Sequence, residues 1–502
     1  MTIETKFHLM EATLDDVQSA MAVGELTSKD LVEMYLKRID AYDAVEGGIN
    51  SVITVNPDAV VDAEKMDALR AAGTILGPFH GVPVMLKDQM DAKGLPTTMG
   101  SVLFKDFYPD EDAAITLKLR EAGAIILAKV TLGEMGGGDT HGTLFGSTRN
   151  PYDLLRTVGG SSGGSAAAVS ANLATVAVGQ EGFASIRRPS SWNGIVGMRP
   201  TPGLVSRAGV YGGWPSRIGS LGPMTRTVTD LAKLLDVMVG YDPEDPETAH
   251  GFGKAPDTYT ASLVKDGLKG ARIGVLRQVF GTASDPDSED FKKVTAAYDK
   301  ALAELAAEGA TLIDVEIPEV NELLATRTGD GSDTSFAVWG ARSKNFPFAS
   351  QAELQAHPLY PTIRPGRQPA SSTAIRAFDP MKHYEYLKAR DKLETNVLKV
   401  MADNKLDAIV HKTVEHQPTL ISEGLGPPYY NMRGAPHLNT FLVYAASMTV
   451  PAGFTVDNLP FGITLFGRAY SEPTLIKLAY AYEQATMHRK PPATAPALAG
   501  EP

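Results

Sequence analysis

The sequence of 502 residues contains no cysteine. Disulfide bonds, thiolate nucleophiles and cysteine-ligated zinc sites are therefore excluded. The first residues lack the basic start and apolar run of a signal peptide, so we expect a cytoplasmic protein. The most apolar stretch, residues 438–456, is interrupted by Asn, Thr, Ser, Pro and Gly, and it is predicted to be buried core and not a membrane span.

Basic clusters are also missing, and the formal net charge is −12. A nucleic-acid partner would require a clustered basic surface, so none is expected, and no membrane partner is expected either. The chain is longer than one ordinary core of about 150 residues but shows no clean linker. We therefore expect one large α/β domain, with at most a subsidiary lobe.

Short, β-branched apolar runs alternate with helical patterns along the chain. Such runs, bounded by Gly or charge, are typical of strands buried on both faces; they occupy residues 82–86, 124–130, 175–178, 273–276, 311–317 and 406–410. Helical spacing covers residues 113–122 and 291–308, and capping boxes predict helix starts at Thr13 and Thr27. The alternation predicts a twisted, mostly parallel central sheet with helices on both faces. Residues 328–380 are irregular and are predicted to form a lid or pocket wall.

Lys87 directly follows the apolar residues 82–86 in the segment Gly-Val-Pro-Val-Met-Leu-Lys-Asp, residues 81–88. Burial disfavours the charged form of a lysine and lowers its pKa, so a neutral Lys87 could accept a proton. The alternative is a lysine whose ammonium reaches solvent at the strand end, or one paired with Asp88.

A glycine-rich loop, Gly-Gly-Ser-Ser-Gly-Gly-Ser at residues 159–165, precedes an alanine-rich helical pattern. It has no lysine and therefore does not match a nucleotide P-loop. Residues 160–164 also satisfy the Gly-x-Ser-x-Gly pattern of the α/β-hydrolase elbow. That elbow follows a strand, whereas residues 150–156 do not read as one, so we discount both interpretations.

Ser185 follows the predicted strand at 175–178, within Gln-Glu-Gly-Phe-Ala-Ser-Ile-Arg at residues 180–187. A serine in a turn that leaves a strand has successive backbone N–H groups beside it, and these can stabilise an oxyanion. The alternative is a helix N-cap serine.

The order and spacing of these segments resemble the amidase signature family. The family pattern has the form Gly-Val-Pro-x-x-x-Lys-Asp, then Gly-Gly-Ser-Ser-Gly-Gly-Ser, then Gly-Gly-Ser-Ile-Arg-x-Pro. The corresponding residues here are 81–88, 159–165 and 183–189, followed by further similar stretches at 194–201, 222–228 and 450–467. The resemblance spans about residue 10 to residue 490 and is weakest over 240–430.

The resemblance implies an α/β amidase signature domain over residues 1–502. It comprises a helical segment at about 1–75, a catalytic core at about 76–240, a less family-like lid or pocket region at about 241–430, and a C-terminal core segment at about 431–490. It assigns Ser185 as nucleophile, Ser161 as a bridging serine after a cis peptide bond, and Lys87 as base. No metal or organic cofactor is implied, and a homodimer is possible because homodimers are common among members of the family.

The resemblance also places an oxyanion hole at the backbone of Gly182, Phe183 and Ala184. The family usually has Asp-x-Gly-Gly before its nucleophile, whereas this chain has Glu-Gly-Phe-Ala at residues 181–184. The Phe183 ring is therefore expected to point into the core or the acyl pocket. Arg187 is expected to brace the turn, while Arg188 either is paired within the protein or meets a substrate carboxylate.

The resemblance implies hydrolysis of an amide-type carbon–nitrogen bond in a small molecule through an acyl-enzyme. Candidate substrate-binding residues are Met135, Phe183, Ile186, Trp214, Trp339 and residues around Tyr430–Met432. For any one of them, ordinary core is the favoured alternative. They favour an apolar or aryl substrate, and esters and carbamates (urethanes) present a similar carbonyl. The alternatives are the glutaminase subunit of a tRNA-dependent amidotransferase and a nucleotide-binding protein.

Overall fold

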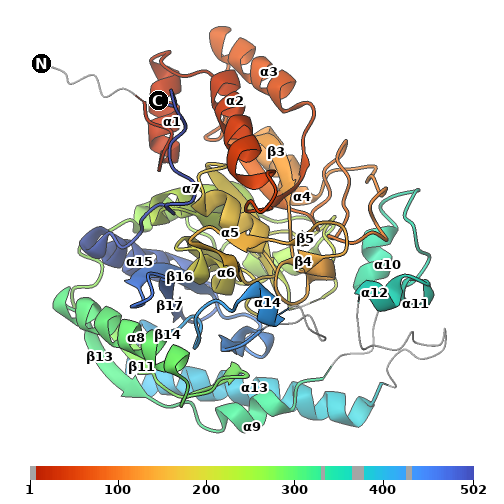
Figure 1. Ribbon diagram of the computed structural model, residues 1–502. Coiled ribbons are helices and arrows are strands. Elements are labelled where there is room, and N and C mark those ends of the chain that lie inside the picture. Colours follow the sequence, from red (N-terminus) through yellow and green to blue (C-terminus); the bar gives the residue numbers. More distant parts are fainter. Residues whose placement is uncertain (1–6, 217, 329–333, 364–377, 425–431) are drawn as a thin grey trace, which may run out of the picture.

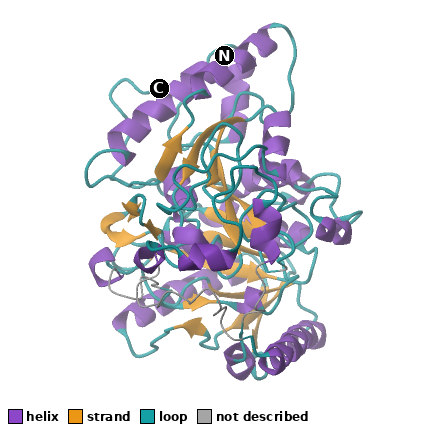
Figure 2. Ribbon diagram, turned by 90° about the vertical axis from the view of Figure 1, so that its right-hand side faces the viewer, coloured by secondary structure: helices purple, strands orange, loops and turns teal. Residues whose placement is uncertain are grey.

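The computed structural model describes residues 7–216, 218–328, 334–363, 378–424 and 432–502. A large sheet crosses the molecule, with helices around it in both views (Figures 1 and 2). In chain order its strands are β1 (Val52–Val55), β2 (Pro83–Lys87), β3 (Ile125–Val130), β8 (Val176–Glu181), β9 (Val196–Arg199), β10 (Ser220–Thr225), β11 (Arg272–Leu276), β13 (Thr311–Val315), β14 (Ala408–Lys412), β16 (Ser447–Phe454) and β17 (Pro460–Phe466). Across the sheet the order is β1-β3-β2-β8-β10-β9-β16-β17-β14-β11-β13.

The predicted α/β class and all six predicted strands are confirmed, but the sheet is mixed and not mostly parallel. Parallel pairing is confined to β2 with β3 and β8, and to β11 with β13 and β14. The other neighbouring pairs are antiparallel. The central strands β2, β8, β10 and β17 are buried along nearly their whole length. Their apolar sequences therefore do not indicate whether a strand runs parallel or antiparallel to its neighbours.

The helices are α1 (Leu14–Ala22), α2 (Ser28–Arg38), α3 (Ala59–Ala71), α4 (Ala114–Glu121), α5 (Gly163–Ser170), α6 (Arg187–Trp192), α7 (Val228–Met238), α8 (Glu289–Ala307), α9 (Val320–Ala325), α10 (Thr334–Gly340), α11 (Gln351–Ala356), α12 (Tyr360–Ile363), α13 (Pro380–Asp403), α14 (Ile421–Gly424) and α15 (Glu472–Thr486). Both predicted capping boxes are present, at Thr13 before α1 and at Thr27 before α2. Within the described chain, no helix is both long and apolar enough to cross a membrane.

Small two-stranded ribbons decorate the sheet: β4 (His141–Gly142) with β5 (Gly146–Ser147), β6 (Arg149–Asn150) with β7 (Asp153–Thr157), and β12 (Gly281–Thr282) with β15 (Ala435–Pro436). The prediction that residues 150–156 contain no strand was wrong, because β7 starts at Asp153. This strand pairs with β6 and, at Arg156, forms a single bridge with Leu420, and it is not one of the strands of the central sheet. The glycine-rich loop therefore does not leave a central strand as a hydrolase elbow does.

Residues 328–380, expected to be irregular, carry the short helices α10, α11 and α12. Their aromatic side chains pack with those of residues 99–107 into a separate apolar cluster that includes Phe104, Phe107 and Trp339. The main core, by contrast, extends from the N-terminal helices to the C-terminal segment. The C-terminus lies beside α1 (Figure 1), where the Leu9 N–H donates to the Pro502 carbonyl at 3.2 Å.

Candidate active site

Lys87 is the last residue of β2, which lies between β3 and β8 in the sheet. Every residue of the strand is buried, and Lys87 has no exposed surface. Its Nζ donates to Ser161 Oγ at 2.7 Å and to the Gln180 carbonyl at 3.2 Å. Strand β2 therefore positions the Lys87 amine within hydrogen-bond distance of Ser161 in the glycine-rich loop.

The lysine has no carboxylate partner in the described chain. The neighbouring Asp88 pairs with Lys129 at 2.9 Å and accepts a hydrogen bond from Thr98, which excludes the Lys87–Asp88 pair. Burial holds the pKa of Lys87 well below its ordinary value of 10.5, and the nearby Glu181 opposes this shift only in part. An uncharged amine at this position can accept a proton.

Ser161 sits directly after a cis peptide bond to Gly160, as the sequence resemblance implies. Arg188 donates to the Gly160 carbonyl at 3.0 Å and pairs with Asp139 at 2.6 Å. Arg188 is buried, so of the two interpretations left open by the sequence the structure supports pairing within the protein. Its contacts hold the loop backbone that directly precedes Ser161.

The two other serines of the glycine-rich loop, Ser162 and Ser165, tie the loop to β8. Ser162 Oγ donates to the Gln180 carbonyl at 3.0 Å, and Ser165 Oγ donates to the Val178 carbonyl at 3.1 Å. Both acceptors belong to β8, the strand that leads into the turn with Ser185. The glycine-rich loop and this turn are thus fastened to one strand.

Ser185 lies in the turn between β8 and α6, and it is nine-tenths buried. The Ser162 N–H donates to the Ser185 carbonyl at 3.0 Å, so the two serine-bearing segments are in direct backbone contact. Within the described chain, the Ser185 hydroxyl makes no hydrogen bond to Ser161 or to any other residue. Catalytic hydrogen bonds of this kind are often open before a substrate binds.

The turn before Ser185 presents backbone N–H groups that have no acceptor among the described residues. Among the described residues, the N–H groups of Gly182, Phe183, Ala184 and Ser185 donate no hydrogen bond. Backbone N–H groups without a protein acceptor are available to a ligand or to water. Their grouping beside a serine is the arrangement that an oxyanion requires.

The buried carboxylate of Glu181 stabilises this turn through hydrogen bonds and an ion pair. Its carboxylate accepts the backbone N–H groups of Ile186 and Arg187 at 2.9 and 3.0 Å, and it pairs with the Arg187 side chain at 2.8 Å. Asn439 also donates to it, at 2.5 Å. Burial alone would raise the pKa of Glu181, but Arg187, the two N–H groups and Arg199 hold it below 4.5. The predicted bracing role of Arg187 is confirmed.

Phe183 and Ala184 replace two glycines of the family pattern, and the turn accommodates both. Neither residue, nor Gly182, has a positive φ, so a side chain causes no backbone strain there. The Phe183 ring is half-buried and stacks on the His437 ring, with 4.7 Å between the ring centroids and 16° between the planes. The Phe183 ring is therefore directed toward His437, in the C-terminal part of the chain.

The comparisons with known proteins agree with this geometry. A family model described as Amidase matches residues 30–476, which include Lys87, Ser161 and Ser185. The chain belongs to the amidase signature family. As a member, it is a hydrolase that acts on carbon–nitrogen bonds.

Three similar proteins span almost the whole of this amidase. A probable amidase from Arabidopsis thaliana is 33% identical, over 98% of this chain and 93% of that protein. A glutamyl-tRNA(Gln) amidotransferase subunit from Geobacter sp. strain M21 is 33% identical, over 95% of this chain and 98% of that protein. The solved structure of native peptide amidase from Stenotrophomonas maltophilia is 34% identical, covers 97% of this chain and 99% of that chain, and has a TM-score of 0.83.

The residues predicted to bind substrate do not form one cluster in this amidase. Met135 and Trp339 both belong to the aromatic cluster with Phe104 and Phe107, and the Trp339 indole N–H donates to Asp91 at 2.9 Å. Ile186 has no exposed surface and packs in the main core, where it supports the turn and cannot line a pocket. Trp214 is half-buried before a cis bond to Pro215. Tyr430 lies outside the described residues.

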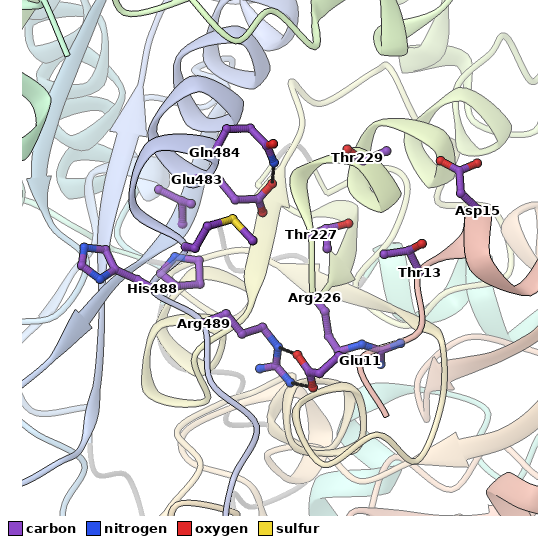
Figure 3. A pocket seen from close by; sticks show the side chains of 13 residues that line it. Glu11, Thr13, Asp15, Arg226, Thr227, Thr229, Glu483, Gln484, His488 and Arg489 are labelled. Carbon is purple, nitrogen blue, oxygen red and sulfur yellow. Dashed lines mark hydrogen bonds and ion pairs between the residues drawn. The ribbon is translucent and has the colours of Figure 1, made fainter. Parts of the chain in front are cut away.

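A cavity of about 370 Å³ lies away from the proposed catalytic residues, between the start of α1, the start of α7 and the end of α15 (Figure 3). Its charged lining is largely paired within the protein. Glu11 pairs with Arg489 at 2.7 Å, and His488 pairs with Glu304 at 2.7 Å. The cavity lies where residues near the N-terminus pack against residues near the C-terminus. None of Lys87, Ser161 or Ser185 lines it.

Within the part of the chain that the structure describes, no three His, Asp or Glu side chains lie together as metal ligands would. Sequence reasoning missed three residues near the turn, namely Arg327, His437 and Asn439. No motif marks them, because each lies far along the chain from Ser185 and reaches the turn only through the fold.

Replacing Arg187 with methionine is expected to destabilise this amidase by about 3–5 kcal/mol, because the buried Glu181 carboxylate would lose its ion-pair partner. Urea unfolding followed by circular dichroism measures the change. Arg277→Met is the matched control: Arg277 is also paired with a carboxylate, but at an exposed site, and its loss should cost less than about 1 kcal/mol. Equal costs for the two variants would contradict the bracing role.

Proposed function

We propose that this amidase cleaves an amide-type bond of a small molecule with Ser185 as nucleophile, Ser161 as bridging serine and Lys87 as base. The observation that carries the proposal is the fully buried Lys87 amine, which lacks a carboxylate partner in the described chain and lies 2.7 Å from Ser161 Oγ. A charged lysine would be poorly stabilised there, whereas a neutral one is a proton acceptor.

The reaction begins with proton transfer. Neutral Lys87 draws the proton of Ser161, and Ser161 draws the proton of Ser185 as the Ser185 oxygen bonds to the substrate carbonyl carbon. The N–H groups of residues 182–185 stabilise the resulting oxyanion. The relay then returns a proton to the departing nitrogen as the carbon–nitrogen bond breaks, which leaves an acyl-enzyme on Ser185. Water releases the acid by the same steps, and no cofactor takes part.

An apolar or aryl substrate fits the surroundings of the turn best. The half-buried ring of Phe183 stands where the family pattern has glycine, and it stacks on His437. Aromatic side chains contribute a large apolar contact area and flat faces for stacking. Esters and carbamates (urethanes) expose a comparable carbonyl, so we propose that they are cleaved as well.

The second candidate function is the release of ammonia from glutamine for a tRNA-dependent amidotransferase, since relatives with that name share 33% identity. A site for the polar glutamine side chain gains nothing from an aromatic ring at position 183. The stand-alone amidase is therefore the better-supported function.

The test is a panel of matched substrates with purified protein alone. Anilide, aryl ester and aryl carbamate hydrolysis are measured beside ammonia release from glutamine. We expect anilide hydrolysis to exceed glutamine hydrolysis in kcat/KM by at least about 100-fold, the size of a difference of roughly 2.7 kcal/mol in transition-state binding. Turnover of glutamine but not of anilides would reject the proposal.

A further inference from the structure

Arg327 lies directly beside the proposed oxyanion turn, although it follows α9, a distant part of the chain. Its guanidinium carbon lies 5.0 Å from the centroid of the Phe183 ring. Phe183 is two residues before Ser185, so Arg327 contacts the segment that carries the proposed nucleophile. Stacking on an aromatic face is a common way to hold a guanidinium plane in one orientation.

The guanidinium of Arg327 has no acceptor in the described chain. No hydrogen bond from its side chain and no carboxylate within 4.0 Å of it is present there. The other arginines around the turn differ: Arg187 pairs with Glu181 at 2.8 Å, and Arg188 pairs with Asp139 at 2.6 Å. In the part of the chain described, Arg327 is therefore the arginine beside this turn whose forked donors remain available.

Among the described residues, no carboxylate balances the charge of Arg327, and the titratable group that interacts with it is the Tyr386 phenol. Burial, together with Arg327 itself, lowers the pKa of His437 to about 4, so His437 is neutral at physiological pH. Glu181 lies beneath the turn, but its carboxylate is already met by Arg187, Asn439 and two backbone N–H groups. A positive potential beside a nucleophile attracts substrates that carry a negative group.

We propose that Arg327 is a specificity residue that binds a carboxylate of the substrate. The substrate class is then an apolar or aryl amide with one carboxylate on its acyl or amine part, a refinement that rests on the proposed function. A guanidinium meets a carboxylate with two parallel N–H···O bonds, which fixes both distance and orientation. The face of Phe183 supports the guanidinium, and the neutral His437 supports Phe183.

The test compares each charged substrate with a neutral isostere. On the acyl side, the 4-nitroanilides of succinic, glutaric and adipic acid are paired with anilides in which an isopropyl group replaces the carboxylate. On the amine side, hexanoyl-4-aminobenzoate is paired with its 4-isopropyl analogue. We expect the wild-type protein to prefer one charged member by at least about tenfold in kcat/KM, as a charge-assisted hydrogen bond allows. The pair that shows the preference identifies the side and the reach.

Arg327→Gln should reduce that preference to less than about threefold, with the neutral isosteres cleaved within about twofold of the wild-type rate. Arg327→Lys, which keeps the charge but not the fork, should retain an intermediate preference that falls as salt is added. Arg277→Gln is the control, because Arg277 is also stacked on a ring, that of Tyr298, but its guanidinium is already paired with Asp299 and Asp314. It should leave the preference unchanged.

Two results would overturn the inference: no preference for any charged substrate in the wild-type protein, or a preference that survives Arg327→Gln. Both can be recognised only when the neutral isosteres are hydrolysed. Failure of the proposed function is distinguishable, since it would abolish cleavage of charged and neutral anilides alike and in every variant.

Discussion

Ser185→Ala is expected to lower kcat/KM for an anilide by at least about 10⁴-fold, because no other group at the turn can form the acyl-enzyme. The protein should remain folded. The Ser185 hydroxyl makes no hydrogen bond in the described chain, so its removal leaves no buried partner unsatisfied. Steady-state hydrolysis and thermal unfolding of the same preparation measure the two effects separately.

The matched control for this variant is Ser170→Ala. Ser170 is also buried and ends α5, but its hydroxyl donates to the Asn193 carbonyl and takes no part in the proposed relay. It should cost stability, about 1 kcal/mol, and change kcat/KM by less than about threefold. A Ser185→Ala protein that keeps more than about one-tenth of the activity would show that another residue is the nucleophile.

Lys87→Ala is expected to lower kcat/KM by about 10³-fold or more, since the bridging serine would lose its proton acceptor. The wild-type pH profile follows from the same residue. The pKa of Lys87 lies below 10.5 because of burial, and only the neutral amine is a base. Activity should therefore be low where Lys87 is protonated, and should rise with pH to a plateau that begins below pH 10.5.

Lys412→Met provides the control for the pH dependence. Lys412 is another buried lysine, whose pKa burial lowers to about 8, but it lies over Phe291 at 3.6 Å and far from Ser161 in the sheet. Its removal should leave the rising limb of kcat/KM where the wild-type protein has it. If the rise of kcat/KM with pH is lost in Lys412→Met but persists in Lys87→Ala, then Lys412 and not Lys87 is the base.

Much of this fold could be predicted because local patterns and buried runs agree. The capping boxes at Thr13 and Thr27, the strand that ends at Lys87 and the long helix α8 are each encoded within a few consecutive residues. The direction of each strand relative to its neighbours, by contrast, is not encoded within a few consecutive residues. It depends on which strands become neighbours, and a run buried on both faces carries no sign of its direction, so the sheet was wrongly expected to be mostly parallel.

The site divides in the same way. Lys87, Ser161 and Ser185 were recognisable because each lies in a contiguous motif with a fixed spacing. The consequence of Phe183 was not, because the tolerance of the turn depends on φ angles and the destination of the ring depends on His437 and Arg327. Ile186 was one of the candidate pocket residues, but its side chain packs in the main core.

The central claim, a neutral Lys87 that activates Ser185 through Ser161, is tested most directly by covalent labelling. The protein is treated with an aryl fluorophosphonate across a range of pH, and the modified peptide is located by mass spectrometry. The account predicts one adduct, on Ser185, formed at a rate that rises with pH to a plateau beginning below pH 10.5 and that falls at least about 100-fold in Lys87→Ala. An adduct on another residue, or a rate on Ser185 that is independent of both pH and Lys87, would contradict it.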